Sequence, residues 1–269
     1  MNAVTVDHLN VRWRKGLPHV LHDLSAQAPA AQWTAVIGPN GAGKSTLLRA
    51  VAGLLPPTAE CTGHIDLGER PLRQWPRTDL ARHLAWLGQG EHGGDALSAS
   101  DVVRLGRLPH QGWWPQASSE LDQAAIQQAM LRTECWHLRH TPMADMSGGE
   151  RQRVRLARVL AVQARLLLMD EPLANLDPPH QADWLNQVHH LTAQGVTVVS
   201  VLHELNIALQ ADHVWLVNHG QVVAQGRAND AWFRDAVVQA FEGRIGLHPI
   251  HGQWVALPLI GAVHSPPAA

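Results

Sequence analysis

Four short, largely apolar segments stand out in the pattern of hydrophobic and polar positions. They cover residues 34–37, 84–88, 166–169 and 197–202. Apolar runs of this length are typical of strands that are buried on both faces of a parallel sheet. Helical stretches alternate with them, so the pattern predicts an α/β fold.

The N-terminal region follows a different pattern. Residues 1 to about 35 alternate as antiparallel strands do, with strands predicted at 3–6 and 9–12 and a turn at Gly16. This region is therefore predicted to form antiparallel strands.

Two later regions also depart from the strand-and-helix alternation. Residues from about 90 to 160 contain helical stretches at 99–105 and 119–131 and no run typical of a buried strand. The last 40 residues begin with an amphipathic stretch at 231–241 and continue into short apolar pieces. The chain then ends in a Ser-Pro-Pro tail that we expect to be disordered.

Composition narrows the function classes. A net charge of -2 over 269 residues gives no basic footprint for nucleic acid. The chain contains no apolar run near the roughly 20 residues of a membrane span, and its first 30 residues lack the order of a secretion signal. We therefore expect a cytosolic protein. Of its 18 histidines only His137 and His140 have one-face helical spacing, so the histidines are predicted to be structural or solvated and not metal ligands.

The first candidate site follows the apolar run at 34–37. It fits the Gly-x4-Gly-Lys-[Ser/Thr] phosphate loop and opens a helical stretch at 47–52. Its residues are Gly38, Pro39, Asn40, Gly41, Ala42, Gly43, Lys44, Ser45 and Thr46. The glycines let consecutive backbone N–H groups converge on an anion, and the helix N-terminus adds partial positive charge. Lys44 is predicted to contact the β- and γ-phosphates of a nucleotide, and Ser45 to bind Mg²⁺.

A second candidate site follows the apolar run at 166–169, where Asp170 and Glu171 precede Pro172. Open α/β sheets bind ligands at the carboxyl ends of their strands. These carboxylates are therefore predicted to lie beside the phosphate loop if the two strands are neighbours. Asp170 is expected to bind Mg²⁺, directly or through water, and Glu171 to polarise the attacking water.

A third feature, Met146-Ser147-Gly148-Gly149-Glu150, precedes the helical run at 153–161. Ser147 and the two glycines form another helix N-terminus suited to an anion, although one nucleotide does not need two such loops from one chain. The combination resembles the ATP-binding subunits of ABC transporters, whose signature motif is Leu-Ser-Gly-Gly-Gln/Glu. Met146 replaces the leucine, an apolar exchange of similar volume.

The resemblance implies an assembly and a fold. Subunits of this family pair head to tail, so Ser147, Gly148 and Gly149 of one chain are expected to close over the ATP bound by a second copy. The implied fold is a P-loop NTPase ABC ATPase core over residues 1–228, with an N-terminal antiparallel β-subdomain and an inserted α-helical subdomain at about 90–160. Residues 229–269 would form a C-terminal extension with a short helix, strands and a flexible tail. ATP and Mg²⁺ are the implied cofactors.

Further residues match family positions in order. Gln89 matches the glutamine that senses Mg²⁺ and water, and His203 matches the switch histidine that contacts the γ-phosphate. Asn175-Leu176-Asp177 resembles the loop that crosses the dimer interface, and Trp13 takes the place of the aromatic residue that stacks on adenine. Taken alone, each also allows a structural interpretation: a loop glutamine, a hydrogen-bonded loop histidine, a turn before two prolines or an edge-strand tryptophan.

ABC-type ATPases drive import, export, DNA repair and translation, so the fold alone does not fix the function. The chain is too short for the coiled-coil insertions of the repair proteins or the two cassettes of the translation factors. Residues 101–110 and 248–258 are similar to stretches of subunits that import iron-siderophores, haem and cobalamin. A helix stop followed by a loop is the structural alternative for residues 106–110.

The resemblance therefore predicts the ATPase subunit of a metal-chelate importer. Its partners would be a second copy of itself, an integral membrane permease and, indirectly, a periplasmic substrate-binding protein, at the cytoplasmic face of the inner membrane. The alternatives are a zinc or manganese importer, an exporter, or a regulatory module that hydrolyses little. Trp113 and Trp114 are predicted to lie in a surface loop, where they either dock the permease or pack into the helical subdomain.

Overall fold

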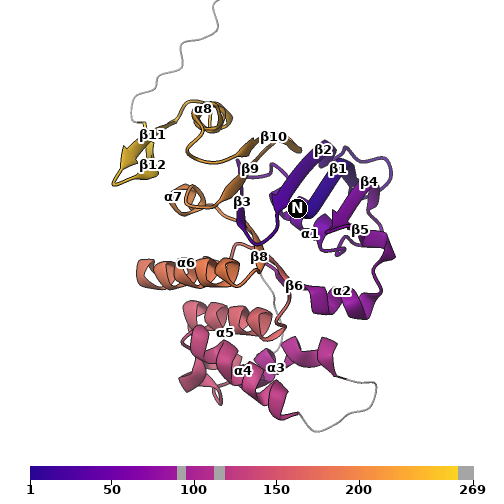
Figure 1. Cartoon of the computed structure of the whole chain (residues 1–269), viewed down its shortest axis with the longest axis vertical. Coiled ribbons are helices and arrows are strands. Elements are labelled where there is room, and N and C mark those ends of the chain that lie inside the picture. Colours follow the sequence, from indigo (N-terminus) through magenta and orange to yellow (C-terminus); the bar gives the residue numbers. More distant parts are fainter. Residues whose placement is uncertain (90–94, 112–118, 260–269) are drawn as a thin grey trace, which may run out of the picture.

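A six-stranded sheet forms the centre of the molecule, with the strand order β10-β9-β3-β8-β7-β6. This computed structural model describes residues 1–89, 95–111 and 119–259 (Figure 1). The strands are β3 (Trp33–Ile37), β6 (Leu84–Leu87), β7 (Leu166–Asp170), β8 (Thr197–Val201), β9 (His213–Asn218) and β10 (Gln221–Gly226). All neighbours pair in parallel except the edge strand β10. The predicted α/β fold and its four apolar strands are confirmed.

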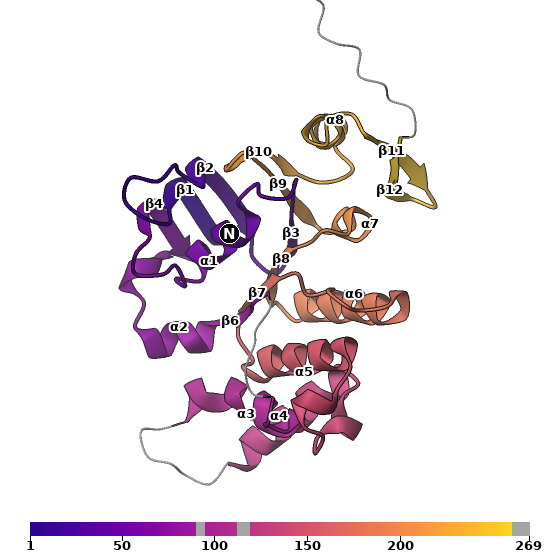
Figure 2. The same cartoon turned by 180° about the vertical axis from the view of Figure 1, so that it is seen from behind.

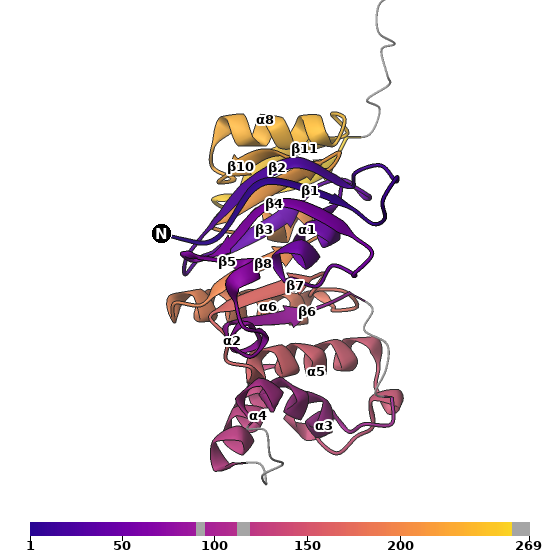
Figure 3. The ribbon, with the colours of Figure 1, turned by 90° about the vertical axis from the view of Figure 1, so that its right-hand side faces the viewer.

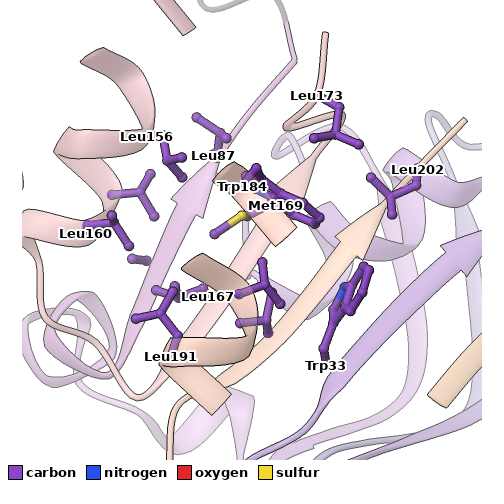
Figure 4. Packing of buried hydrophobic residues seen from close by; sticks show 14 of the residues in the cluster. Trp33, Leu87, Leu156, Leu160, Leu167, Met169, Leu173, Trp184, Leu191 and Leu202 are labelled. Atoms are coloured by element: carbon purple, nitrogen blue, oxygen red, sulfur yellow. The ribbon is translucent and has the colours of Figure 1, made fainter. Parts of the chain in front are cut away.

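The central strands are apolar on both faces because each face packs against a separate core. Trp33 and Met169 point into the core that Figure 4 shows, where Trp184 of α6 (Pro178–Ala193) meets Trp33 edge to face at 5.4 Å. Val36 and Leu168 belong to the opposite core. Each large apolar side chain that is fully buried in this way stabilises the fold by about 1.5–3 kcal/mol.

The N-terminal strands form a four-stranded antiparallel sheet with the order β2-β1-β4-β5. They are β1 (Asn2–Arg12), β2 (Leu21–Pro29), β4 (Glu60–Leu67) and β5 (Arg70–Pro71). Helix α1 (Lys44–Val51) contributes its apolar side chains to the core that this sheet shares with the central sheet. The prediction of separate strands at 3–6 and 9–12 is wrong. They are one strand, because the left-handed backbone of His8 (φ 48°) shifts the register and lets the strand continue.

Helices gather at one end of the molecule (Figures 1 and 2). These elements are α3 (Ala99–Arg104), the 3₁₀ helix η2 (Leu105–His110), α4 (Glu120–Arg132), the short turns η3 (Trp136–Leu138) and η4 (Met143–Asp145), and α5 (Gly148–Ala161). Nearer the centre lie η1 (Leu72–Gln74), α2 (Arg77–His83) and α7 (Leu205–Ala208). The helices predicted at 99–105 and 119–131 are thus confirmed, whereas Trp113 and Trp114 lie outside the described residues.

The C-terminal extension lies at the opposite end from the helical region (Figure 3). It consists of α8 (Ala231–Ala240) and a hairpin of β11 (Ile245–Ile250) and β12 (Gln253–Pro258). The Ser-Pro-Pro tail that was predicted to be disordered lies within residues 260–269, outside the described residues. None of the helices in the described parts of the chain has the length and apolar character needed to cross a membrane.

Residues 106–110 do more than end a helix, because they cover the C-terminal end of α5. A Cβ atom on Gly106 would lie 2.2 Å from the carbonyl oxygen of Arg158. Arg107 is buried and donates to Asp122 Oδ1 and to the carbonyl oxygen of Ala161, each at 2.7 Å. Since the last carbonyls of a helix have no partner within it, this contact both satisfies and anchors the end of α5.

Candidate active site

The phosphate-loop pattern lies between β3 and α1, as predicted, and its glycines are required by the backbone. Gly38 has φ 145°, and a Cβ atom there would lie 1.9 Å from the carbonyl oxygen of Val217. Gly43 has φ 100°, and its Cβ atom would lie 2.6 Å from Leu21 Cδ2. The loop therefore keeps its shape only with glycine at both places, and that shape leaves the N-terminus of α1 without any side-chain cap.

Lys44 is a buried cation within this loop. Its ammonium group donates to the carbonyl oxygens of Gly38, at 2.8 Å, and Pro39, at 3.0 Å, and only 6% of the residue is exposed. Burial lowers the pKa of Lys44, while the carboxylates of Glu171 and Asp170 oppose that shift. A positive charge whose direct partners are neutral carbonyl groups favours an anion in the same place.

Asp170 ends β7 and reaches the phosphate loop. The hydroxyl group of Ser45 donates to Asp170 Oδ1 at 3.0 Å, and Asp170 Oδ2 is buried without a hydrogen-bond partner among the described residues. Burial raises the pKa of Asp170, and the hydrogen bond from Ser45 opposes that effect. The strands that carry the two sites are not direct neighbours, because β8 lies between β3 and β7. Both still end at the same sheet edge.

Glu171 brings the other two predicted catalytic residues together. Its backbone is left-handed, with φ 54°, and it accepts a hydrogen bond from Gln89 Nε2 at 2.8 Å. The second carboxylate oxygen lies 2.7 Å from His203 Nε2. These residues follow β6, β7 and β8, so three adjacent strand ends supply one hydrogen-bonded group.

An open cleft of about 540 Å³ joins these parts. It is lined by Val20, Asn40, Gly41, Ala42, Gly43, Lys44, Ser45, Thr46, Gln89, Glu171 and His203. Phosphate-loop residues and the predicted catalytic group thus share one cavity. Trp13 follows the end of β1 and is not among the lining residues, so its stacking role stays a prediction.

The signature residues do not line this cleft. Ser147 caps α5 and forms a capping box: its N–H donates to Glu150 Oε2 at 2.8 Å, and the Glu150 N–H donates to Ser147 Oγ at 3.3 Å. These bonds lower the pKa of Glu150. Gly148 and Gly149 pack against Asn175; Cβ atoms added to them would lie 3.4 Å from its Cβ and 3.2 Å from its carbonyl oxygen, respectively.

His180 lies on α6, is hydrogen-bonded to Arg153 of α5, the helix that follows the signature residues, and was not predicted from the sequence. Glu134, His180 and Asp183 bring ligand atoms within 4.8 Å of one another, as metal ligands do. However, His180 Nδ1 pairs with Asp177 and its Nε2 with Arg153, so both ring nitrogens are engaged. The signal in the sequence was the spacing Asp177-Pro-Pro-His180. It is typical of an N-cap aspartate followed, three residues later, by the residue whose backbone N–H donates to it.

Comparison with known proteins identifies the family. The sequence pattern described as "ABC transporter" matches residues 21–174, which is more than half of the chain. The chain belongs to the ABC transporter family. This membership confirms the predicted fold class and the predicted ATPase activity. The phosphate loop and the Asp170-Glu171 pair both lie within the matched region.

Two relatives and one solved structure show the extent of the likeness. The chain is 41% identical over 214 residues to the hemin import ATP-binding protein HmuV of Pseudomonas entomophila, covering 77% of this chain and 81% of the relative. It is 34% identical over 243 residues to the petrobactin import ATP-binding protein FpuD of Bacillus anthracis, covering 89% and 88%. A dimeric structure of a bacterial ABC transporter cassette covers 84% of this chain and 99% of that chain, with a TM-score of 0.73 and 21% identity.

Proposed function

We propose that the chain is the ATP-hydrolysing subunit of an importer for a metal chelate, such as an iron-siderophore, haem or cobalamin. The observation that carries the hydrolytic part is the position of Glu171, whose carboxylate joins Gln89 to His203 in the cleft lined by Lys44. The cargo class is supported by the relatives, which are named for hemin and petrobactin import.

The residues of the cleft divide the work. The N–H groups of the phosphate loop and Lys44 bind the phosphates, and Trp13 stacks on the adenine. Glu171 accepts the proton of the attacking water, and Gln89 and His203 hold the Glu171 carboxylate in place.

The residues beside Lys44 also fit Mg²⁺. Ser45 and Asp170 offer a hydroxyl and a carboxylate 3.0 Å apart, and the buried Asp170 Oδ2 has no other partner among the described residues. Oxygen donors of this kind are the ligands that Mg²⁺ prefers, with Gln89 as a further amide oxygen nearby. When bound, the ion neutralises the negative charge of the phosphates.

The working unit in this proposal is a head-to-tail homodimer beneath a membrane permease, at the cytoplasmic face of the inner membrane. Ser147, Gly148 and Gly149 lie outside the cleft of their own chain, which fits a role toward the ATP of a second copy. A structural relative of this fold is a dimeric cassette, which supports pairing of two copies. A periplasmic substrate-binding protein would deliver the chelate, and residues 1–228 would form the cassette.

Two other functions differ in testable ways. A zinc or manganese importer, or an exporter, would use the same cleft for a different cargo; the names of the relatives favour chelates. A regulatory module that hydrolyses little would not need the Glu171, Gln89 and His203 arrangement.

The test combines the purified chain with its permease and its substrate-binding protein in lipid vesicles and measures ATP hydrolysis and uptake of hemin, a ferric siderophore or cobalamin. Glu171→Gln should keep ATP binding and lower turnover at least about 10²-fold, because the general base is lost. The control is Glu242→Gln, which removes an exposed carboxylate paired with Arg244. Unchanged turnover in Glu171→Gln would assign the base to another residue. Hydrolysis that no chelate stimulates would overturn the cargo class.

A further inference from the structure

The loop that follows β7 is fastened to the beginning of α5. Gln152 is buried and donates from Nε2 to the carbonyl oxygen of Pro172 at 2.9 Å. Asn175 has a left-handed backbone, with φ 63°, and packs against Gly148 and Gly149. Two segments that α5 and β7 separate in the sequence are therefore in contact near the signature motif.

His180 adds a polar connection between the same two elements. Its Nδ1 pairs with the Asp177 carboxylate at the end of the loop, and its Nε2 lies 2.9 Å from Arg153 Nη1 on α5. A guanidinium group only donates hydrogen bonds, so His180 Nε2 must accept and Nδ1 must carry the proton. The imidazole is thus a neutral bridge between a cation on α5 and an anion on the loop.

Each end of this bridge depends on His180. Among the described residues, His180 is the hydrogen-bond partner of the Arg153 guanidinium, whose Nε is buried without a partner. Asp177 also accepts from the His180 backbone N–H, at 3.3 Å, as the cap of α6. These bonds hold the pKa of the Asp177 carboxyl below its usual value. Loss of the imidazole would leave Arg153 unpaired and Asp177 with the backbone bond alone.

We propose that His180 is a positioning residue that locks the loop 174–177 to the signature helix, so that both meet the nucleotide of a second chain as one block. The inference rests on the head-to-tail dimer of the proposed function. Among the described residues, the hydrogen-bond partners of His180 are Arg153 and Asp177, and His180 does not line the cleft of its own chain. Its effect should therefore appear when two chains close on ATP and not when one chain binds it.

The test measures ATP-driven dimerisation of the full-length chain in a Glu171→Gln background, by light scattering or sedimentation. Adding His180→Ala should weaken the dimer about tenfold, the scale of one hydrogen bond to a charged group. The affinity of the monomeric chain for ATP should stay the same. His190→Ala is the matched control, because His190 lies on the same helix and, among the described residues, its side chain is hydrogen-bonded only to Gln194, four residues further on.

Two further variants separate positioning from folding. Arg153→Met keeps an aliphatic stem and removes the donor, so it should cause the same loss as His180→Ala, and the double variant should be no worse than either single one. His180→Gln retains an amide that can accept from Arg153 and should recover part of the dimer. Additive losses, or equal loss with His180→Gln and His180→Ala, would overturn the lock. The Arg153 variant also decides the question if His180→Ala melts below the assay temperature.

The failure of the inference differs from the failure of the proposed function. If Glu171→Gln alone forms no dimer with ATP, the head-to-tail model falls. If Glu171→Gln dimerises and His180→Ala dimerises equally well, only the role of His180 falls. Stoichiometric binding of Zn²⁺ that His180→Ala abolishes would instead assign His180, Glu134 and Asp183 to a metal site.

Discussion

The chain has two helix N-termini that are rich in glycine, and they differ in what satisfies them. Helix α1 begins after Gly43 with no side-chain cap and with the Lys44 cation buried beside it. Helix α5 begins with Ser147 and a complete capping box with Glu150. Unpaired N–H groups at a helix start favour an anion. We therefore expect the N-terminus of α1 to bind an anion in the cleft of its own chain. At the second end, Ser147 and Glu150 already provide hydrogen-bond partners for two backbone N–H groups.

This difference gives a reason why one chain has two glycine-rich helix N-termini. We expect an anion to stabilise the start of α1 more than the start of α5. Lys44 donates only to neutral carbonyl groups among the described residues, and the N-terminus of α1 has no side-chain cap. The start of α5 is held in shape beforehand by Ser147 and Glu150 and by the loop that contains Asn175. A turn that is already formed loses little conformational entropy when it meets an anion from elsewhere. We infer that the start of α1 binds the phosphates of its own chain's nucleotide and that the start of α5 contacts the nucleotide of a second copy.

The largest expected effect concerns the far end of α5. Arg107→Ala should destabilise the chain by about 3 kcal/mol, because it leaves the buried Asp122 carboxylate without its ion-pair partner and frees the carbonyl of Ala161. Chemical denaturation measures this change, with Arg104→Ala, an exposed partner of Asp101, as the control. A change as small as in the control would show that α5 does not depend on this anchor.

Next in size is the loss of the buried cation at α1. Lys44→Ala should weaken ATP binding by the monomeric chain about 10- to 100-fold, because charged hydrogen bonds to phosphate are lost. Ser147→Ala should leave this affinity unchanged, since Ser147 does not line the cleft. Equilibrium titration with a fluorescent ATP analogue measures both. An equal loss of ATP affinity in the two variants would show that the starts of α1 and α5 do not differ in their contribution to ATP binding by one chain.

Much of this comparison was accessible from the sequence. The apolar runs placed β3, β6, β7 and β8 correctly, and parallel strands bring their carboxyl ends to one edge, so the position of Asp170 and Glu171 at the edge that carries the phosphate loop followed from pattern. Gln89 and His203 were singled out by the family resemblance, and their hydrogen bonds to Glu171 were not predicted. The family resemblance supplied their roles, which remain predictions until measured.

Other features lay beyond such reasoning for physical reasons. The bulge at His8 has a left-handed backbone at a residue that is not glycine, so no local pattern marks it. The bonds from Arg107 and His180 join residues that are distant in the sequence, and a single chain offers no signal for such pairs. The insertion of β8 between β3 and β7 is a topological choice that periodicity does not encode.

A smaller effect is expected from removing the cap of α5. Ser147→Ala should cost about 1 kcal/mol of stability, the usual value for a lost N-cap, while Gly43 offers no comparable side chain at α1. Thermal melting measures the difference, and Ser147→Asp should retain most of the stability because Asp also caps well. If Ser147→Asp has the same melting temperature as Ser147→Ala, the side-chain cap does not stabilise the N-terminus of α5.

The smallest effect is the pH dependence of the same capping box. Hydrogen bonds from Ser147 lower the pKa of Glu150 in the folded chain, so the unfolded chain binds more protons and the stabilisation is present above the unfolded pKa. It is lost as the pH falls through the folded pKa, which lies below the usual value of glutamate. Because Glu150 is partly exposed, the contribution is only a few tenths of a kcal/mol. Glu150→Gln should therefore be slightly less stable than the parent at pH 7, and the gap should shrink on acidification toward pH 3 in denaturation experiments. A gap that widens in acid would mean that the carboxylate opposes the fold, and that the signature turn, like the phosphate loop, is held open for a ligand.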